Sequence, residues 1–146
     1  MGKPPRPRPG QATAPVDARQ IPPSPAHTKA RVSFEYYKSG DKYCLSNFNK
    51  EQIISFLDCL RKLTERTWQQ MLEGTSKDSA KKTGLNCTPY TRSDLANPGI
   101  WPKQLSPDIS TLFGVRATQR RRVFGVRIQS VFYVLWFDED HSIVNG

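Results

Sequence analysis

The pattern of apolar and polar positions changes along the chain from strand-like to helical and back to strand-like. Residues 32–37 (VSFEYY) alternate and are rich in strand-forming side chains, so they predict a first strand. Residues 38–41 supply turn chemistry, and residues 42–45 (KYCL) predict a short second strand. The N-terminal part of the domain is therefore expected to start with one or two strands.

A helical pattern begins after Asn49, which can cap a helix while Gln52 closes a capping box. Apolar spacings of three and four define one face, and Phe56 and Leu63 widen it; its members are Ile53, Leu57, Leu60, Thr64, Trp68 and Met71. Cys59 falls within this pattern and is expected in the core. Gly74 is a natural stop. The pattern fits one long helix or a hairpin of two helices with Thr64 capping the second.

The C-terminal third predicts three strands at residues 111–117, 122–128 and 131–137, the last two joined by a tight turn at Gln129 and Ser130. The final strand is apolar on both faces and is expected to be central and doubly covered. Residues 138–141 should then turn, and residues 142–145 should form a short edge strand. Before these strands lies a long loop at about 74–108, pinned in part by Tyr90, Ile100 and Trp101.

These elements predict a single α+β domain over residues 31–146, in the order β-(β)-α-β-β-β. Its small antiparallel sheet would pack on the helix or helical hairpin. Residues 1–30 hold most of the twelve prolines and no Leu, Phe, Tyr or Trp, so they cannot bury enough apolar surface to fold. They predict a disordered, Pro-rich basic tail, with polyproline-II character.

Composition narrows the class of protein. The three cysteines have no CxxC spacing and only two histidines accompany them, so we expect no metal site, no cofactor and no disulfide framework. No apolar segment follows the basic N-terminus, and the apolar run 131–137 is far shorter than the roughly twenty residues of a membrane-spanning helix. We therefore expect no membrane association and a cytoplasmic location.

The charge indicates a polyanionic partner. Lys and Arg number 22 against 13 Asp and Glu, a formal net charge of +9. Part of this charge is concentrated in a stretch without acids, which contains Arg116, Arg120, Arg121, Arg122 and Arg127. Arginine is suited to bidentate phosphate contacts. Strand alternation places Arg116 and Arg127 on adjacent strands with the triplet at the turn between them, and we expect one patch.

A second constellation follows the apolar strand, where Asp138 and Asp140 flank a turn that ends in His141. A histidine can move protons near neutral pH, and neighbouring carboxylates would orient it. Beside the arginines it would suit cleavage of a phosphodiester, with arginine stabilising the developing charge. Aromatic side chains are also available for base stacking, namely Tyr36, Tyr37, Tyr43, Tyr133, Trp68, Trp101 and Trp136. Trp68 and Trp136 fit core positions better.

The segments Arg122–Arg127 (RVFGVR) and 131–141 (VFYVLWFDEDH), together with the order of elements, resemble the RelE/ParE toxin superfamily, including its HigB branch. The resemblance spans residues 32–146 in topology and 110–145 in residue pattern. It implies an mRNA-cleaving toxin, often acting on the ribosome, that an antitoxin neutralises. It assigns Arg116 and Arg127 to phosphate and transition-state stabilisation, Tyr133 and His141 to proton transfer, and Asp138 or Asp140 to orienting His141.

Two functions therefore stand as expectations. The first is a metal-independent endoribonuclease of a toxin–antitoxin system, with Arg120, Arg121 and Arg122 as further RNA contacts. The second is a non-catalytic module that binds nucleic acid or a host protein, such as gyrase, through the same basic surface.

Overall fold

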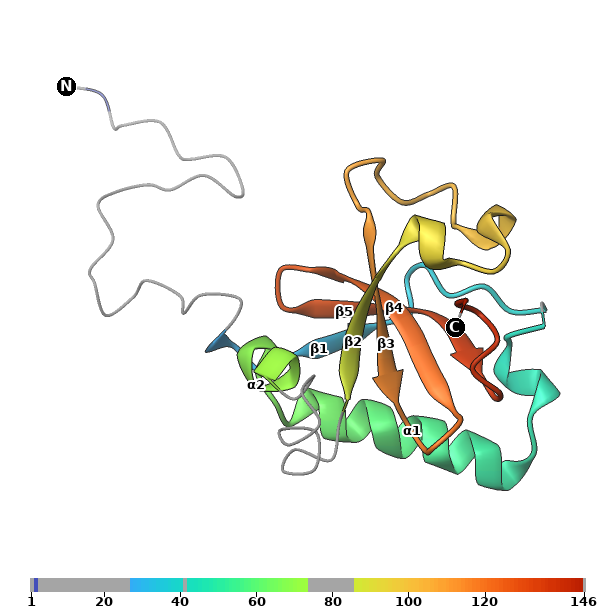
Figure 1. Ribbon diagram of the computed structural model, residues 1–146. Helices are drawn as coiled ribbons and strands as arrows, with labels where there is room; N and C mark the ends of the chain where they lie inside the picture. Colours follow the sequence, from blue (N-terminus) through green and yellow to red (C-terminus); the bar gives the residue numbers. More distant parts are fainter. Residues whose placement is uncertain (1, 3–26, 41, 74–85, 146) are drawn as a thin grey trace.

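The computed structural model describes residue 2 and residues 27–40, 42–73 and 86–145. Most of the expected tail (1–30), the expected helix stop at Gly74 and the first part of the expected long loop lie outside the described residues. The described part is an α+β fold in which a five-stranded sheet packs on one main helix (Figure 1). Neither described helix has the length and apolar character that crossing a bilayer requires.

The sheet is mixed. Its strands are β1 (Arg31–Ser33), β2 (Cys87–Thr91), β3 (Thr111–Arg116), β4 (Arg122–Ile128) and β5 (Val131–Asp138), in the spatial order β1-β5-β4-β3-β2. The pairs β3–β4 and β4–β5 are antiparallel, as predicted, and β2 also pairs antiparallel with β3. β1 runs parallel to β5, so the predicted antiparallel sheet is wrong at this edge. A short hairpin turn forces the two strands that it joins to run antiparallel. β1 and β5 are joined instead by a long connection that includes the helices, and such a crossover allows the two strands to run parallel.

The predicted strand at residues 42–45 is wrong. This segment turns and continues into a 3-10 helix, Leu45–Asn47. Local hydrogen bonds take the place of a ladder: the Leu45 N–H donates to the Tyr37 hydroxyl (3.0 Å), and the Asn47 side-chain amide donates to the Lys42 carbonyl (3.2 Å). Side chains that bond the backbone in this way compete with strand pairing.

The expected loop at 74–108 contains a strand, β2, that the sequence pattern did not indicate. Pro89 lies in its middle, opposite Phe113, and proline argues against a strand because it donates no ladder hydrogen bond. It is tolerated here because β2 is an edge strand. The predicted anchors are confirmed: Trp101 is buried, and Tyr90 and Ile100 pack against the same core cluster.

Two helices, not one, follow the first strand: α1 (Lys50–Thr64) and α2 (Trp68–Glu73). The capping box of Asn49 and Gln52 is confirmed. Thr64 does not cap the second helix, because its hydroxyl donates back to the Arg61 carbonyl (2.7 Å). Thr67 does so instead, since its hydroxyl accepts from the Gln70 N–H (3.2 Å). Of the two readings of the pattern, the two-helix reading is correct.

The buried face of α1 is turned relative to the predicted one. Phe56, Cys59, Leu60 and Leu63 are buried, whereas Leu57 is 48% exposed. These buried side chains, together with Trp68 and Met71 of the second helix, form a core cluster against one face of the sheet. Cys59 is a core residue, as predicted.

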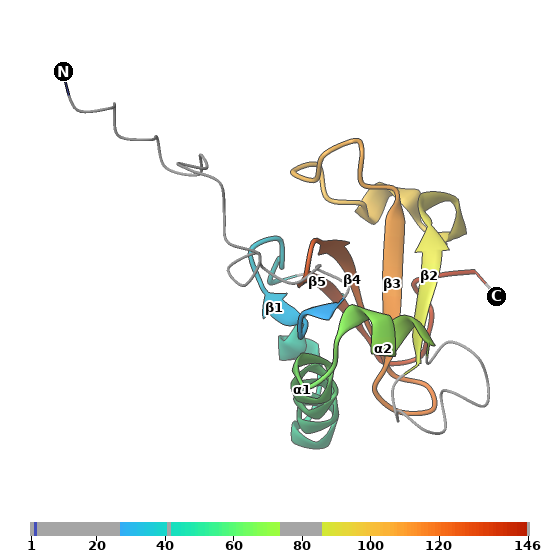
Figure 2. The ribbon, with the colours of Figure 1, turned by 90° about the vertical axis from the view of Figure 1, so that its left-hand side faces the viewer.

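A second core cluster lies on the opposite face of the sheet, under the segment 92–109 and the C-terminal turn. Figures 1 and 2 both show α1 and the yellow-to-gold segment on opposite sides of the molecule. β5 contributes Phe132, Val134 and Phe137 to the first cluster and Leu135 and Trp136 to the second. The prediction of a central, doubly covered strand is therefore confirmed.

A register shift between β4 and β5 explains why Leu135 and Trp136, adjacent in sequence, share a face. Gly125 pairs with Val134 and Phe124 with Trp136, so Leu135 is an extra residue. A Cβ atom on Gly125 would collide with the Tyr133 carbonyl oxygen and the Phe132 ring, and the bulge requires glycine there. Among the described residues after β5, the one β-type pairing is an isolated bridge between Leu95 and Val144, and the predicted strand at 142–145 is wrong.

Candidate functional site

Two arginines lie side by side on the face of the second core cluster. Arg116 of β3 is the register partner of Arg122 of β4, which in turn faces Asp138 of β5. Directly opposed residues of antiparallel strands have Cα atoms about 4.5–5.5 Å apart. Burial lowers the pKa of Arg122, and the charge of Arg116 lowers it further. The positive charges of Arg116 and Arg122 therefore repel each other, and an anion bound between the two guanidinium groups would relieve that repulsion.

The arginine triplet is engaged largely with the protein itself. Arg122 Nη1 donates to the carbonyl oxygens of Thr118 (2.7 Å), Gln119 (3.1 Å) and Arg121 (3.0 Å) and so holds the β3–β4 turn closed. Arg120 is exposed. Of the three residues expected to contact nucleic acid, Arg120 is thus the one on the open surface.

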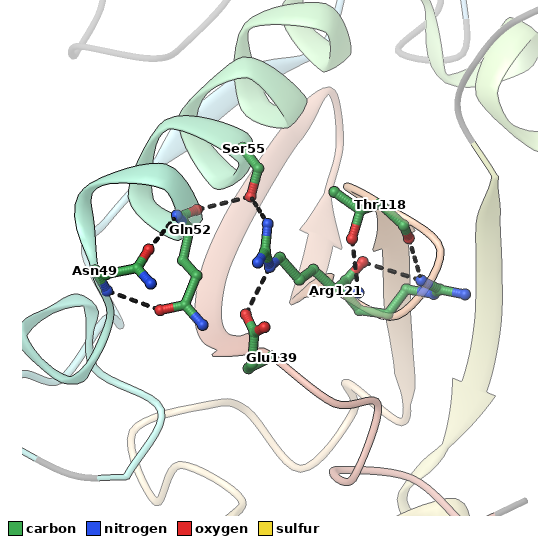
Figure 3. Close-up of polar contacts among 7 residues, drawn as sticks. Asn49, Gln52, Ser55, Thr118, Arg121 and Glu139 are labelled. Carbon is green, nitrogen blue, oxygen red and sulfur yellow. Dashed lines mark hydrogen bonds and ion pairs between the residues drawn. The ribbon is translucent and has the colours of Figure 1, made fainter.

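Figure 3 shows Arg121 reaching from this turn to two other elements. Its Nε donates to Glu139 Oε2 (2.7 Å), and its Nη1 donates to Ser55 Oγ of α1 (3.3 Å). Ser55 in turn donates to the Gln52 carbonyl in the first turn of the helix (2.7 Å). Arg121 therefore ties the turn to the start of α1 and to the residue after β5, which is a structural role.

Arg127 is not part of the same patch, and the expectation of one arginine cluster is wrong in this respect. It lies five residues beyond Arg122 on β4, about 16 Å along a strand at roughly 3.3 Å per residue. Its guanidinium carbon stands 4.7 Å from the centre of the Trp68 ring, on the helix-covered face, and its Nε donates to the Gln129 carbonyl (2.8 Å). Five residues is an odd separation, so strand alternation places the side chains of Arg122 and Arg127 on opposite faces of the sheet, which the expectation of one patch overlooked.

Tyr133 lies on the same face as Arg116 but elsewhere along the sheet. It pairs with Val126, and its ring centre is 5.0 Å from that of Tyr36. The structure thus brings Tyr133 to the aromatic segment after β1 and does not bring it to the paired arginines.

Asp138 is fully buried, and its partners are in the C-terminal turn. Its Oδ2 accepts the Ile143 N–H (2.9 Å), and its Oδ1 accepts the Ser142 hydroxyl (3.3 Å). Burial raises the pKa of Asp138, and the neighbouring Asp140 raises it further. The hydrogen bond with Ser142 lowers the pKa of Asp140. Both oxygens of Asp138 serve the turn, so Asp138 positions His141 through the backbone.

His141 is half-buried and adopts the left-handed backbone region (φ 58°). Its ring centre is 6.3 Å from that of Phe124, and the Tyr90 ring centre is 6.0 Å from the same phenylalanine. Tyr90 lies close enough to Arg122 for the guanidinium charge to act on its hydroxyl, while burial raises the pKa of Tyr90 and keeps it protonated. Sequence reasoning gave Tyr90 only an anchoring role, because its strand was not predicted.

The candidate site thus consists of Tyr90, Arg116, Arg122 and His141, arranged around Phe124. It offers two cations, a protonated hydroxyl and an imidazole on one face of the sheet. Among the described residues, no three His, Cys, Asp or Glu side chains gather in a way that could hold a metal ion. Comparisons with protein-family models, with curated proteins and with solved structures find no match for this chain.

Proposed function

We propose that this protein is a metal-independent endoribonuclease whose site is the cluster of Tyr90, Arg116, Arg122 and His141. The observation that carries the proposal is the pairing of Arg116 with Arg122 beside Tyr90 and His141. Paired guanidinium groups bind a phosphodiester and stabilise the extra negative charge that develops on its oxygens during cleavage.

The proposed reaction uses the ribose itself as nucleophile. His141 accepts the proton of the 2′-hydroxyl, whose oxygen bonds to the adjacent phosphorus. The bond from phosphorus to the 5′-oxygen breaks, and that oxygen receives a proton from the Tyr90 hydroxyl. The products are a 2′,3′-cyclic phosphate and a 5′-hydroxyl. Acid–base groups of this kind typically contribute about 10²–10⁴-fold to a rate.

The biological setting in this proposal follows the resemblance to RelE-like toxins. The protein would act in the cytoplasm on mRNA, including mRNA on ribosomes, and a protein antitoxin would neutralise it. Arg127 and Tyr133 lie outside the proposed reacting centre, and Asp138 positions the turn. Arg121 shapes the loop that carries Arg120, and Arg122 both shapes this loop and belongs to the reacting centre.

A second candidate is a module that binds RNA without cleaving it. It is favoured by the engagement of Asp138 with the backbone, which leaves His141 without the carboxylate partner that orients many catalytic histidines. In this reading the exposed Arg116 and Arg120 supply salt-sensitive phosphate contacts.

The test is incubation of the purified full chain with single-stranded RNA in a chelating buffer, alone and with translating ribosomes. Cleavage with cyclic phosphate ends is expected, and Arg116→Ala should slow it by about 10²–10³-fold. Arg127→Ala is the matched control, since it removes an arginine from the opposite face and should retain cleavage. Unchanged cleavage by His141→Ala would contradict the assigned site. Salt-sensitive binding without cleavage would favour the second candidate.

A further inference from the structure

A large open pocket lies beside the candidate site, and neither proposed function uses it. Its walls come from residues 35–38, 42 and 43, which follow β1, and from residues 97–104, and its floor is Leu135 and Trp136 of β5. Figure 1 draws the two wall segments in blue to cyan and in gold. The pocket volume is about 1130 Å³, somewhat above the roughly 300–1,000 Å³ typical of small-ligand sites. It can therefore accept more than one small planar group.

Five of the fifteen described lining residues are aromatic. Tyr36 and Tyr43 are half-buried wall residues, while Trp101 and Trp136 are nearly buried and form the apolar base. Tyr36 is held by its contact with Tyr133. The Tyr43 carbonyl accepts the Phe137 N–H (3.2 Å), which fixes this wall to β5. The ring of Tyr36 is thus restrained by its contact with Tyr133, and the backbone of Tyr43 by its bond to β5, so both residues are positioned to offer a ring face to a base.

The rim is basic. Lys38, Lys42 and Lys103 are exposed, and Glu35 is the one carboxylate among the described lining residues. Lys42 Nζ stands 5.4 Å from the centre of the Tyr43 ring, so a cation and a stacking face lie together. Stacking faces beside lysines are the combination by which proteins hold single-stranded nucleic acids.

The pocket and the candidate site are joined through the sheet. Trp136 in the floor is the register partner of Phe124. The rings of Tyr90 and His141 both pack near the ring of Phe124. Adjacent strands are about 4.8 Å apart. The wall at 97–104 is anchored to the turn that holds His141, because the Ala96 N–H donates to the Ile143 carbonyl (2.9 Å). One strand of nucleic acid can therefore reach both.

We propose that this pocket is a base-binding subsite for single-stranded RNA. Unpaired bases stack on Tyr36 and Tyr43, the lysines at the rim hold the intervening phosphates, and the strand continues to Arg116 and Arg122. The assignment of RNA as ligand rests on the proposed function, whereas base binding does not require cleavage. In a duplex the bases are already stacked and paired, so duplex RNA cannot enter.

A different occupant with chemistry suited to aromatic grooves is a Pro-rich peptide, and this chain carries such a sequence at residues 3–9 (KPPRPRP). Charge argues against it. That sequence bears three cations and no acid, and the pocket rim bears three lysines against one glutamate. RNA has the complementary sign.

The experiment measures binding of the full chain to a short single-stranded RNA, to an abasic strand of equal length and charge, to a duplex and to a mononucleotide. The wild type should bind the base-bearing single strand at least about tenfold more tightly than the abasic strand. Tyr43→Leu and Tyr36→Leu should each weaken binding of the RNA by about tenfold and leave binding of the abasic strand unchanged.

Controls separate the pocket from general charge and from folding. Phe34→Leu removes an aromatic ring that is 46% exposed outside the pocket and should change no affinity. Lys103→Ala should weaken both the RNA and the abasic strand, whereas Lys62→Ala on α1 should weaken neither. Thermal unfolding identifies any tyrosine variant that has lost its fold. In that case the preference of the wild type for RNA over the abasic strand tests base binding, and the lysine pair tests whether the strand lies at this pocket.

The inference is overturned if the tyrosine variants weaken the RNA and the abasic strand equally, if duplex binds as well as single strand, or if a mononucleotide binds as tightly as the RNA. Displacement of RNA by a peptide of residues 3–9 would also overturn it. If a variant with both Tyr36 and Tyr43 replaced still cleaves RNA normally, the base-binding subsite is refuted and the proposed cleavage is not. If the wild type binds bases in the pocket but does not cleave RNA, only the proposed cleavage is refuted.

Discussion

The carboxylate of Asp138 is expected to stabilise the C-terminal turn, and Asp138→Asn tests this directly. The substitution keeps size and shape but removes one acceptor, so the buried Ile143 N–H loses its charged partner (2.9 Å). Asparagine keeps one carbonyl acceptor, so the cost is the difference between a hydrogen bond to a charged group, about 1.5–3 kcal/mol, and one to a neutral group, about 0.5–1.5 kcal/mol. Part of this is offset, because burial raises the pKa of Asp138 and the variant no longer buries a carboxylate. We expect a net loss of about 1–2 kcal/mol.

The assay is urea unfolding, in which the midpoint should fall while its steepness stays constant. In a domain of this size the loss corresponds to a decrease in melting temperature of roughly 4–8 °C. Amide hydrogen exchange at Ile143 should accelerate in the variant. Asp140→Asn is the matched control, since it removes an equal charge from an exposed position and should change stability by less than about 0.5 kcal/mol. Equal midpoints for the two variants would refute the role given to Asp138.

Three further outcomes are expected. Phe56→Ala should destabilise the domain by about 3–5 kcal/mol and Leu57→Ala by well under 1 kcal/mol, because the first side chain is fully buried and the second is 48% exposed; similar urea midpoints would contradict the assigned helix face. Gly125→Ala should lower the melting temperature strongly, because its Cβ would meet the Tyr133 carbonyl; a wild-type melting curve would refute the bulge. Hydrogen bonds from Ser46 and Tyr37 lower the pKa of Cys44 from 9.0 to about 6, so its thiolate should contribute stability above pH 9 that is lost as the pH falls through about 6. Ultraviolet thiolate absorbance, compared with Cys44→Ser, should titrate near 6, since Cys59 and Cys87 have pKa values of about 12; a midpoint near 9 would contradict it.

Local signals predicted the elements whose partners are near in sequence. The β4–β5 hairpin and the capping box of Asn49 depend on residues a few positions apart, and the structure has them where the pattern indicated. β2 was missed because Pro89 is acceptable only at an edge, and edge position is a property of the whole sheet. The parallel direction of β1 likewise depends on a crossover that no local pattern encodes.

Only part of the candidate site was predicted, because residue types can be read locally whereas their placement depends on the whole sheet. Arg116, Arg122 and His141 were identified from residue type, and register then placed two of them side by side. The separation of Arg127 depends on strand length and on which face each side chain occupies. The pocket could not be predicted, because Tyr43 and Lys103 meet only after two distant segments pack on β5.

The parallel pairing of β1 with β5 has a consequence for synthesis of the protein. β5, the interior strand between β1 and β4, is the last of the five described strands to leave the ribosome, about a hundred residues after its partner β1. Until then the apolar face of α1 has no β5 to cover it, and contacts of such long sequence separation form slowly. A chain in this state exposes apolar surface and is vulnerable to aggregation and to capture by chaperones. The yield of folded protein should therefore depend on chaperone capacity more than the size of the domain would suggest.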